Sequence, residues 1–588
     1  MTWSYCRLTE SRKAAPHHHA GVCVAVLLVV LGAVDSAHGA PAEEPAAETP
    51  RPGAVLPSFG TRAIVERPTR PQGLPDDASL QQSGSVIGTI SIKPLDIFDT
   101  SIAEENTWLF RLANTLHINT RPRTIERQLL FTPGDRYDPR LLRENERLLR
   151  KARYLREAWI TPTAVQGGKV DLEVTTRDVW TLNPGVSFGR KGGKSTSGFE
   201  IEELNLLGTG AQLGLSRRTE IDRTTDLLIY RDRQLGNTWW SIDAELADNS
   251  DGKRRVLELD HGFYALDTRR AGGVAYVDDT RIDSRYDLGQ VVGQYATETK
   301  FASAYAGWSK GLIDGEVLRY RVGVTQEEHL FDSIGDKRPG SVVPADRKLV
   351  YPWISMEWLQ DEFREARNRD QIERTEDFQY GWQVTGRLGY AAESLGSTKN
   401  SLVFDASASH GIELDSKSTV LLSGNVRGRH DGSDFVDTVI AGSARYYHRQ
   451  SQRRLWFASL SLEQGHKLDA DRQLLLGGDN GLRGYPLRYQ AGEGRWLLTV
   501  EQRFFTDWYP FRLVNVGGAI FADAGGALGD NPYGSQPRGV LTDVGIGLRL
   551  GNSRTALGNV LHVDLAFPLN GDRSISNMQL VIETKSSF

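Results

Sequence analysis

Apolar and polar residues alternate along most of the chain after residue 180. The alternating runs are about ten residues long and are separated by clusters of Gly, Asp, Asn and Ser, a pattern typical of strands with one apolar face. About fifteen such runs precede residue 477 and about five follow it, which predicts an even total of up to about twenty strands. The clearest runs are the last ones, at 495–505, 513–523, 543–550, 561–567 and 578–585.

So many one-sided strands need either a second sheet or lipid to cover their apolar faces. Runs of about 9–11 residues fit a tilted membrane-spanning strand better than the shorter strands of soluble sandwiches. Closing the sheet also removes the unpaired edges that hydrocarbon does not tolerate. We therefore expect residues 181–588 to form a transmembrane antiparallel β-barrel, with a soluble sandwich as the alternative.

The region 86–180 has a different pattern, in which short strands and helical stripes are mixed. It predicts a small domain of β-α-α-β-β order. The expected elements are a strand at 86–92, helices at 124–131 and 139–155, and strands at 158–165 and 169–174.

Two segments precede this domain. Residues 1–39 combine early positive charge, one apolar run and a small-residue cleavage pattern, so we expect a secretory signal peptide. Residues 40–85 are rich in Pro, Ala and Glu and predict an extended, disordered linker. Both cysteines, Cys6 and Cys23, lie in the signal segment, so the mature chain is expected to contain none.

Composition excludes several functions. The net charge of −5 argues against a nucleic-acid binder, which usually has a basic domain. Residues 185–189 fit the G-x-S-x-G pattern of hydrolases, but a basic, Gly- and Ser-rich turn follows where that motif needs a helix. No metal-ligand spacing or phosphate loop stands out either. We therefore expect no enzymatic activity, no cofactor and no metal.

Three short motifs stand out in the barrel region. They are Gly481-Leu482-Arg483-Gly484-Tyr485, Phe521-Ala522-Asp523-Ala524-Gly525 and Asn205-Leu206-Leu207-Gly208-Thr209-Gly210. These motifs resemble those of one family, the BamA/TamA-type outer-membrane assembly and translocation superfamily of bacterial surface antigens. The unit at 86–180 matches a POTRA domain, and the terminal Phe588 matches an outer-membrane sorting signal. The resemblance implies a barrel of usually sixteen strands after periplasmic POTRA domains. The chain departs from this in having room for one POTRA unit and in its higher strand count.

The glycine-rich stretch around residue 483 is the first candidate site. Alternation places Asp523 and Glu501 on the lumen face, and the resemblance implies that the loop folds inward so that Arg483 meets Asp523 in a bidentate pair. An exposed arginine on a mobile loop is the alternative. The predicted latch comprises Gly481, Arg483, Gly484, Tyr485, Glu501, Phe521, Asp523 and Gly525.

The second candidate site is the seam where the first and last strands meet. Proline removes a ladder donor and glycine weakens strand order, so the first strand is expected to pair poorly. Such a seam suits lateral opening and strand addition by a client, which is the family's proposed insertion mechanism. The predicted seam residues are Pro184, Gly185, Val186 and Phe188 with Leu580, Ile582 and Phe588.

The third candidate is a basic surface on the POTRA-like unit. Residues 121–157 contain 11 basic and 6 acidic side chains. They predict either a solvated helical face or a docking surface for clients and accessory proteins. The docking residues we expect are Arg143, Arg147, Arg150 and Lys151.

Taken with the resemblance, these features predict an outer-membrane protein that inserts or translocates polypeptides. Its expected partners are membrane lipid, unfolded polypeptide clients and a periplasmic or inner-membrane accessory protein. The POTRA-like domain and both mature termini are expected in the periplasm. The alternatives are a two-partner-type transporter for one exported protein and a passive porin or structural barrel.

Overall fold

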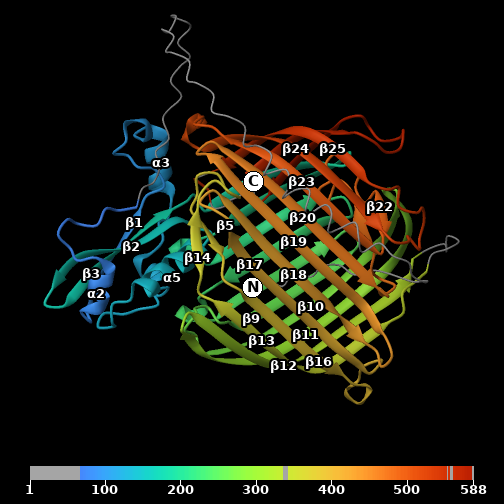
Figure 1. Cartoon of the computed structure of the whole chain (residues 1–588), viewed down its shortest axis with the longest axis horizontal. Coiled ribbons are helices and arrows are strands. Elements are labelled where there is room, and N and C mark those ends of the chain that lie inside the picture. Colours follow the sequence, from blue (N-terminus) through green and yellow to red (C-terminus); the bar gives the residue numbers. More distant parts are fainter. Residues whose placement is uncertain (1–66, 335–341, 553, 556–559, 586–588) are drawn as a thin grey trace, which may run out of the picture. The chain divides into compact units, whose positions relative to one another are not determined.

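The computed structural model describes residues 67–334, 342–552, 554–555 and 560–585, which belong to one compact unit. The expected signal peptide 1–39, most of the expected linker 40–85 and Phe588 lie outside these residues. Within them, a small mixed α/β domain is followed by a barrel (Figure 1). No helix in the described ranges is long and apolar enough to cross a membrane.

The small domain is built on a three-stranded mixed sheet of order β1-β3-β2. Strand β3 runs parallel to β1 and antiparallel to β2. One apolar cluster, which includes Ile125, Leu149 and Val174, joins the sheet to its helices. The POTRA-like β-α-α-β-β order is thereby confirmed. The elements are α2 (Asp77–Gln82), β1 (Val86–Leu95), η1 (Ala103–Glu105), α3 (Trp108–Leu116), α4 (Pro122–Glu126), α5 (Pro139–Arg150), β2 (Leu155–Gln166) and β3 (Lys169–Asp178).

Helix boundaries differ from those expected. Helix α5 begins as predicted, with the Asp138 carboxylate accepting from the Arg140 amide and proline at the first helical position. It ends at Arg150, because Leu155 is the first residue of β2 and packs in the core. Helices α2 and α3 were not predicted; α2 lies within the Pro-rich range 40–85 and its Leu80 joins the same core.

The described part of the barrel is a closed antiparallel sheet of twenty strands. This number confirms the count of alternating runs in the sequence, and it is higher than the sixteen strands that the resemblance implies. Fifteen strands precede residue 477 and five follow it. They are β4 (Leu182–Lys191), β5 (Lys194–Glu203), β6 (Gln212–Thr219), β7 (Thr224–Asp232), β8 (Ser241–Asn249), β9 (Gly252–His261), β10 (Arg270–Asp287), β11 (Gln290–Ile313), β12 (Glu316–Ser333), β13 (Arg347–Gln360), β16 (Gln383–Ala391), β17 (Ser401–Glu413), β18 (Ser418–His430), β19 (Phe435–Ser451), β20 (Arg454–His466), β23 (Gly494–Phe505), β24 (Val514–Leu528), β25 (Leu541–Asn552), β26 (Val560–Pro568) and β27 (Gln579–Lys585).

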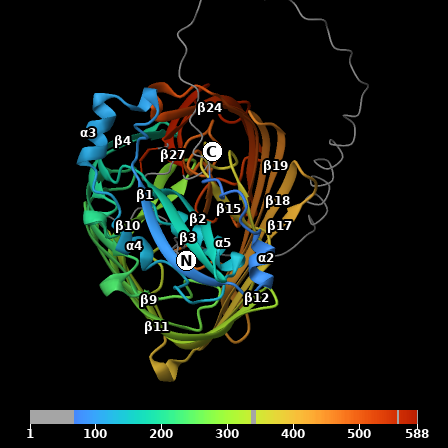
Figure 2. The ribbon, with the colours of Figure 1, turned by 90° about the vertical axis from the view of Figure 1, so that its left-hand side faces the viewer.

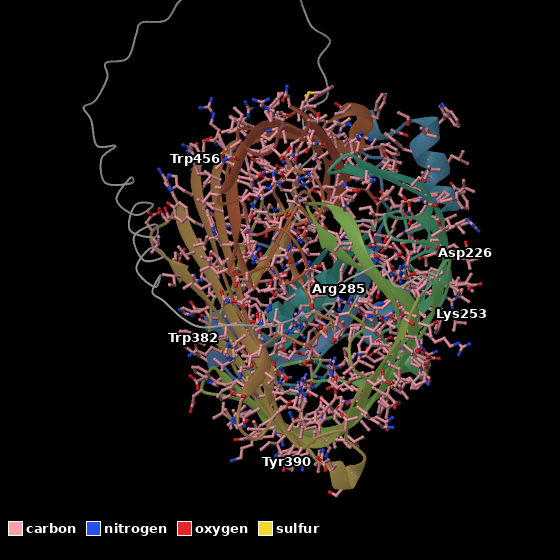
Figure 3. All side chains as sticks on the ribbon, turned by 90° about the vertical axis from the view of Figure 1, so that its right-hand side faces the viewer. Asp226, Lys253, Arg285, Trp382, Tyr390 and Trp456 are labelled. Carbon is pink, nitrogen blue, oxygen red and sulfur yellow. The ribbon has the colours of Figure 1, made fainter. Side chains whose placement is uncertain are left out.

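Side chains follow the predicted alternation. Ile520, Ile546 and Leu548 point outward and are exposed, whereas Glu501 and Asp564 point inward and are buried. Figure 3 shows Trp382, Tyr390 and Trp456 at the outer edge of the ring of strands. An apolar outside around a polar inside is the arrangement of a membrane barrel.

Two connections form small sheets of their own. Residues 361–382, here called the inner hairpin, contain β14 (Phe363–Ala366) and β15 (Glu376–Gln379). Residues 467–493, the latch loop, contain β21 (Leu474–Leu476) and β22 (Gln490–Gly492). Figure 2 shows β15 within the ring of strands. Both segments position the candidate site.

Candidate functional site

The latch loop packs against the barrel wall at close range. Gly481 has a φ of 115°, which favours glycine, and a Cβ at Gly484 would lie 2.7 Å from Cβ of Asp543. Tyr485 is fully buried, and its hydroxyl donates to the carbonyl oxygen of Thr542 at 2.8 Å. Leu476 and Leu482 complete the apolar contact. The glycines therefore serve close packing rather than mobility.

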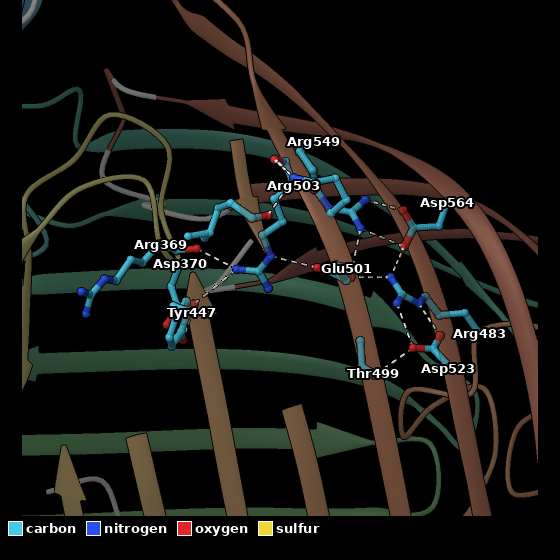
Figure 4. A network of polar contacts seen from close by, with 12 residues as sticks. Arg369, Asp370, Tyr447, Arg483, Thr499, Glu501, Arg503, Asp523, Arg549 and Asp564 are labelled. Atoms are coloured by element: carbon cyan, nitrogen blue, oxygen red, sulfur yellow. Dashed lines mark hydrogen bonds and ion pairs between the residues drawn. The ribbon is translucent and has the colours of Figure 1, made fainter. Parts of the chain in front are cut away.

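Arg483 makes polar contacts with three carboxylates that this packing encloses, at one end of the network in Figure 4. Its Nε and Nη2 donate to the two carboxylate oxygens of Asp523 at 2.7 and 2.9 Å. Its Nη1 donates to Glu501 at 2.9 Å and to Asp564 at 3.3 Å. The Arg483 side chain is 4% exposed and that of Asp523 is 0%. This is a desolvated, bidentate ion pair, and removal of either partner from such a pair strongly destabilises a protein.

The spacing of the Phe-x-Asp-x-Gly motif has a direct physical reason. Residues two apart on a strand point to the same face, so Phe521 and Asp523 both face the loop. The Arg483 guanidinium lies 3.4 Å from the centroid of the Phe521 ring while it binds Asp523. A Cβ at Gly525 would lie 3.3 Å from Leu476 of the loop. In this motif, Phe521 supplies an aromatic face, Asp523 supplies a carboxylate, and Gly525 leaves room for Leu476.

The contacts extend beyond the residues predicted for the latch. Arg503 donates to Glu501 at 2.9 Å, and Arg549 pairs with Asp564. Three guanidinium groups and three carboxylates therefore share one described cluster in the lumen. Sequence reasoning missed Arg503, Arg549 and Asp564 as site residues, although alternation places each of them on a polar inward face.

The inner hairpin reaches the same cluster. Its backbone carbonyl at Arg369 accepts from Nη1 of Arg503 at 2.7 Å. Asp370 accepts from the hydroxyl of Tyr447 at 2.9 Å and from Arg445 at 3.1 Å. The buried Ile372 belongs to one apolar cluster with Leu421, Tyr447, Leu455, Phe457, Phe505, Ala519 and Val560, which come from β18, β19, β20, β23, β24 and β26. The hairpin connects the neighbouring strands β13 and β16, yet its contacts are with these distant strands, so it crosses the inside of the barrel.

The other side of the inner hairpin holds helix α5. Arg150 donates to both carboxylate oxygens of Asp377, at 2.9 and 2.6 Å, and to Glu365 at 2.8 Å. Burial alone would lower the pKa of Arg150, but these acidic partners outweigh it and hold the pKa above its ordinary value. Arg147 lies 4.0 Å from the ring centroid of Phe363.

These contacts bear on the predicted docking surface. Arg147 and Arg150 bind the chain's own hairpin, so neither side chain lies open to a partner in this arrangement. Arg143 and Lys151 are exposed. Sequence reasoning missed the hairpin, whose charged residues resemble a solvated turn.

The seam between β4 and β27 is weakly paired among the described residues. Only Ile582 and Arg190 are registered as partners, whereas ten residue pairs join β4 to β5. Lys191 and Glu583 add an ion pair beside that contact. The register places Ile582 opposite Arg190 rather than opposite Val186 or Phe188, which are exposed.

The Asn-x-Leu-Gly-x-Gly turn joins the barrel to the small domain. The Asn205 amide donates to the hydroxyl of Thr120 at 2.8 Å, and the Gly208 carbonyl accepts from Thr124 at 2.9 Å. A Cβ at Gly210 would lie 2.9 Å from the Tyr154 hydroxyl oxygen. The motif's conformation therefore fits the surface of α4 and its neighbours.

No protein-family model matches the sequence, and no match was found among curated proteins. Solved structures are similar at low identity. BamA from Haemophilus ducreyi lacking POTRA domains 1–3 is 14% identical over 85% of this chain and 85% of its own, with a TM-score of 0.35. CdiB from Acinetobacter baumannii is 12% identical over 86% and 74%, with a TM-score of 0.40. CdiB from Escherichia coli is 11% identical over 86% and 77%, with a TM-score of 0.42. A POTRA-like domain followed by a closed antiparallel barrel is the architecture that the motifs of the BamA/TamA-type superfamily predict for this chain, and it is the architecture found.

Proposed function

We propose that this chain is a bacterial outer-membrane protein that inserts polypeptides into the membrane through the β4–β27 seam, as a member of the BamA/TamA-type superfamily. The observation that supports this best is the seam itself, which has one registered pair among the described residues, where β26 and β27 share seven. A strand edge with few partners presents backbone N–H and C=O groups to which an incoming strand adds. The latch cluster lies on the adjacent wall, in β23 to β26.

The proposal includes the domain limits and the orientation. Residues 1–39 are a signal peptide, 86–180 the POTRA-like domain and 181–588 the barrel, and 40–85 are a linker whose last part, α2, packs on the POTRA-like core. The POTRA-like domain and both mature termini face the periplasm, where Arg143, Lys151 and their neighbours meet clients or an accessory protein.

The two segments packed inside the lumen favour insertion at the seam over export through the pore. The latch loop and the inner hairpin both pack inside the barrel, from Tyr485 in one to Ile372 in the other. A secretion transporter for one partner remains the second candidate, because displacement of the hairpin would clear a path. A passive porin fits poorly, since two buried segments obstruct its channel.

The proposed function is tested with the full-length protein in phospholipid vesicles. A urea-unfolded eight-stranded outer-membrane barrel serves as the probe, and its folding is followed by heat-modifiable mobility on gels. We expect faster folding than in vesicles that are empty or contain a porin. An equal folding rate would contradict insertion, and a probe protected inside the vesicles would favour the secretion alternative.

Removing the inner hairpin is expected to open the barrel to ions. Replacement of residues 364–378 by a short Gly-Ser turn removes Ile372 and the contacts of Arg369 and Asp370 from the lumen. Planar-bilayer recordings should show a clearly larger and more stable single-channel conductance than the wild type. Shortening the η4 turn (Glu393–Leu395), which holds no buried residue, is the control and should leave conductance unchanged. Equal conductance in both variants would mean that the hairpin does not close the pore.

A further inference from the structure

Helix α3 carries an apolar stripe that the described protein does not cover. Trp108, Leu109, Leu112 and Leu116 are spaced i, i+1, i+4 and i+8, so they lie along one side of the helix. Trp108 is 70% exposed and Leu116 is 63% exposed. Thr115 borders the stripe, and the exposed Arg111 lies farther round the helix. The side of the helix that carries the stripe is therefore apolar, and its exposure to water is energetically unfavourable.

The opposite side of α3 is fixed to the molecule. Phe110 stacks on Phe98 with ring centroids 4.1 Å apart. The Asn114 amide donates to the Phe98 carbonyl at 2.9 Å, and its oxygen accepts from the Phe98 amide at 3.1 Å. Ala113 packs in the cluster that contains Trp180 and Leu513. The exposed stripe is thus held rigidly in one orientation.

The anchoring residues lie where the barrel wall begins. Trp180 precedes β4, and Leu513 precedes β24. Figure 2 shows α3 beside β4. From this rim the exposed apolar residues Leu182, Val186 and Phe188 continue up the outer face of β4. The stripe of α3 therefore lies at the rim from which the exposed apolar face of β4 begins.

Aromatic residues extend the same rim. The turn between β23 and β24 exposes Phe511 by 83% and Trp508 by 49%. Arg512 in this turn pairs with Glu104 and Glu105, directly before α3. Exposed Trp and Phe at the end of a membrane barrel are typical of the belt at lipid headgroup level.

We propose that α3 is an interfacial helix that lies in the membrane leaflet beside the β4–β27 seam, with Trp108, Leu109, Leu112 and Leu116 among the lipid chains. An amphipathic helix with a Trp- and Leu-rich face binds in this way, parallel to the membrane surface. The inference rests on the proposed membrane location. Under this proposal, α3 anchors the POTRA-like domain to the membrane next to the β4–β27 seam.

Spin labelling tests this placement, since the chain's only cysteines are Cys6 and Cys23. The full-length protein, with both changed to serine, carries one nitroxide at Leu112→Cys and, in a matched control, at Arg111→Cys, which lies about 100° round the helix from Leu112. In vesicles of phosphatidylethanolamine with phosphatidylglycerol, the label at 112 should collide more with oxygen than with a water-soluble nickel chelate. The label at 111 should show the reverse. Leu116→Cys provides a second reporter should the first variant assemble poorly.

Two results would overturn the proposal. Labels at 112 and 116 that collide with the nickel chelate as readily as the label at 111 would place α3 in water. Labels shielded from both reagents would mean that protein covers the stripe. The measurement uses no client, so its outcome is separate from that of the insertion assay: lipid exposure without probe insertion would leave the anchor standing and remove the proposed function.

Discussion

A disulfide between cysteines at Arg190 and Ile582 is expected to abolish client insertion while leaving the barrel assembled. These residues face each other across the seam and are the registered pair there. Directly opposed residues of antiparallel strands have Cα atoms about 4.5–5.5 Å apart, within the range that a disulfide spans. The bridge would hold β4 against β27, so an incoming strand would have no edge on which to pair. Reductant should restore insertion of the unfolded barrel probe.

The matched control uses the same first cysteine. Ser195 on β5 is also registered opposite Arg190, so Arg190→Cys with Ser195→Cys locks β4 to β5 and leaves the seam alone. This variant should insert the probe as the wild type does, with or without reductant. Full insertion by the seam-locked protein would exclude lateral opening. Transport through the lumen would then be the better explanation of any activity.

Replacing Arg483 with alanine should produce the second large effect. It leaves Asp523, Glu501 and Asp564 buried and short of one guanidinium, and breaking a buried ion pair in this way costs about 3–5 kcal/mol. Because about 1.4 kcal/mol corresponds to tenfold in an equilibrium, the ratio of packed to released loop should fall about a hundredfold or more. We expect a loss of at least about tenfold in assembled protein or in insertion rate. Arg483→Lys keeps the charge but loses the two-pronged geometry, so it should recover only part.

The reference variant for Arg483 must be chosen from the structure. Arg512 is near in sequence, but it is buried and paired with Glu104 and Glu105, so its loss is not neutral. Arg573 is exposed, and Arg573→Ala should behave as the wild type. Exchanging charges by Arg483→Asp with Asp523→Arg should not rescue function, because the new aspartate would face Glu501 and Asp564. Mild, equal effects of Arg483→Ala and Arg573→Ala would contradict the latch.

Much of the barrel was predictable because alternation reports directly on which face a residue occupies. In β23 and β24 it placed Glu501 and Asp523 inside the lumen without knowledge of any neighbour. The approach of Arg483 to Asp523 came from motif resemblance instead, since no local pattern shows how far a loop folds inward. Strand number followed from counting runs, and it exceeded the number that the resemblance suggested.

What could not be predicted depends on contacts between distant segments. Asp370 and Arg369 belong to a stretch that is charged throughout, and only the closed barrel gives those charges buried partners such as Arg503. The pairing of Arg190 with Ile582 depends on how the last strand slides against the first, which neither strand's sequence records. Helix α3 was overlooked because its apolar stripe spans barely two turns.

Glu501 connects the two segments that pack inside the barrel. One of its oxygens binds Arg483 of the latch loop at 2.9 Å, and the other binds Arg503, which holds the backbone of the inner hairpin. The latch loop contacts this carboxylate directly, and the inner hairpin is linked to it through Arg503. Withdrawing the latch loop removes Arg483 from Glu501, and withdrawing the inner hairpin removes the Arg369 carbonyl and Asp370 from Arg503, so either departure disturbs the buried charges that hold the other segment. The latch loop and the inner hairpin are therefore coupled, so that release of one from the lumen favours release of the other.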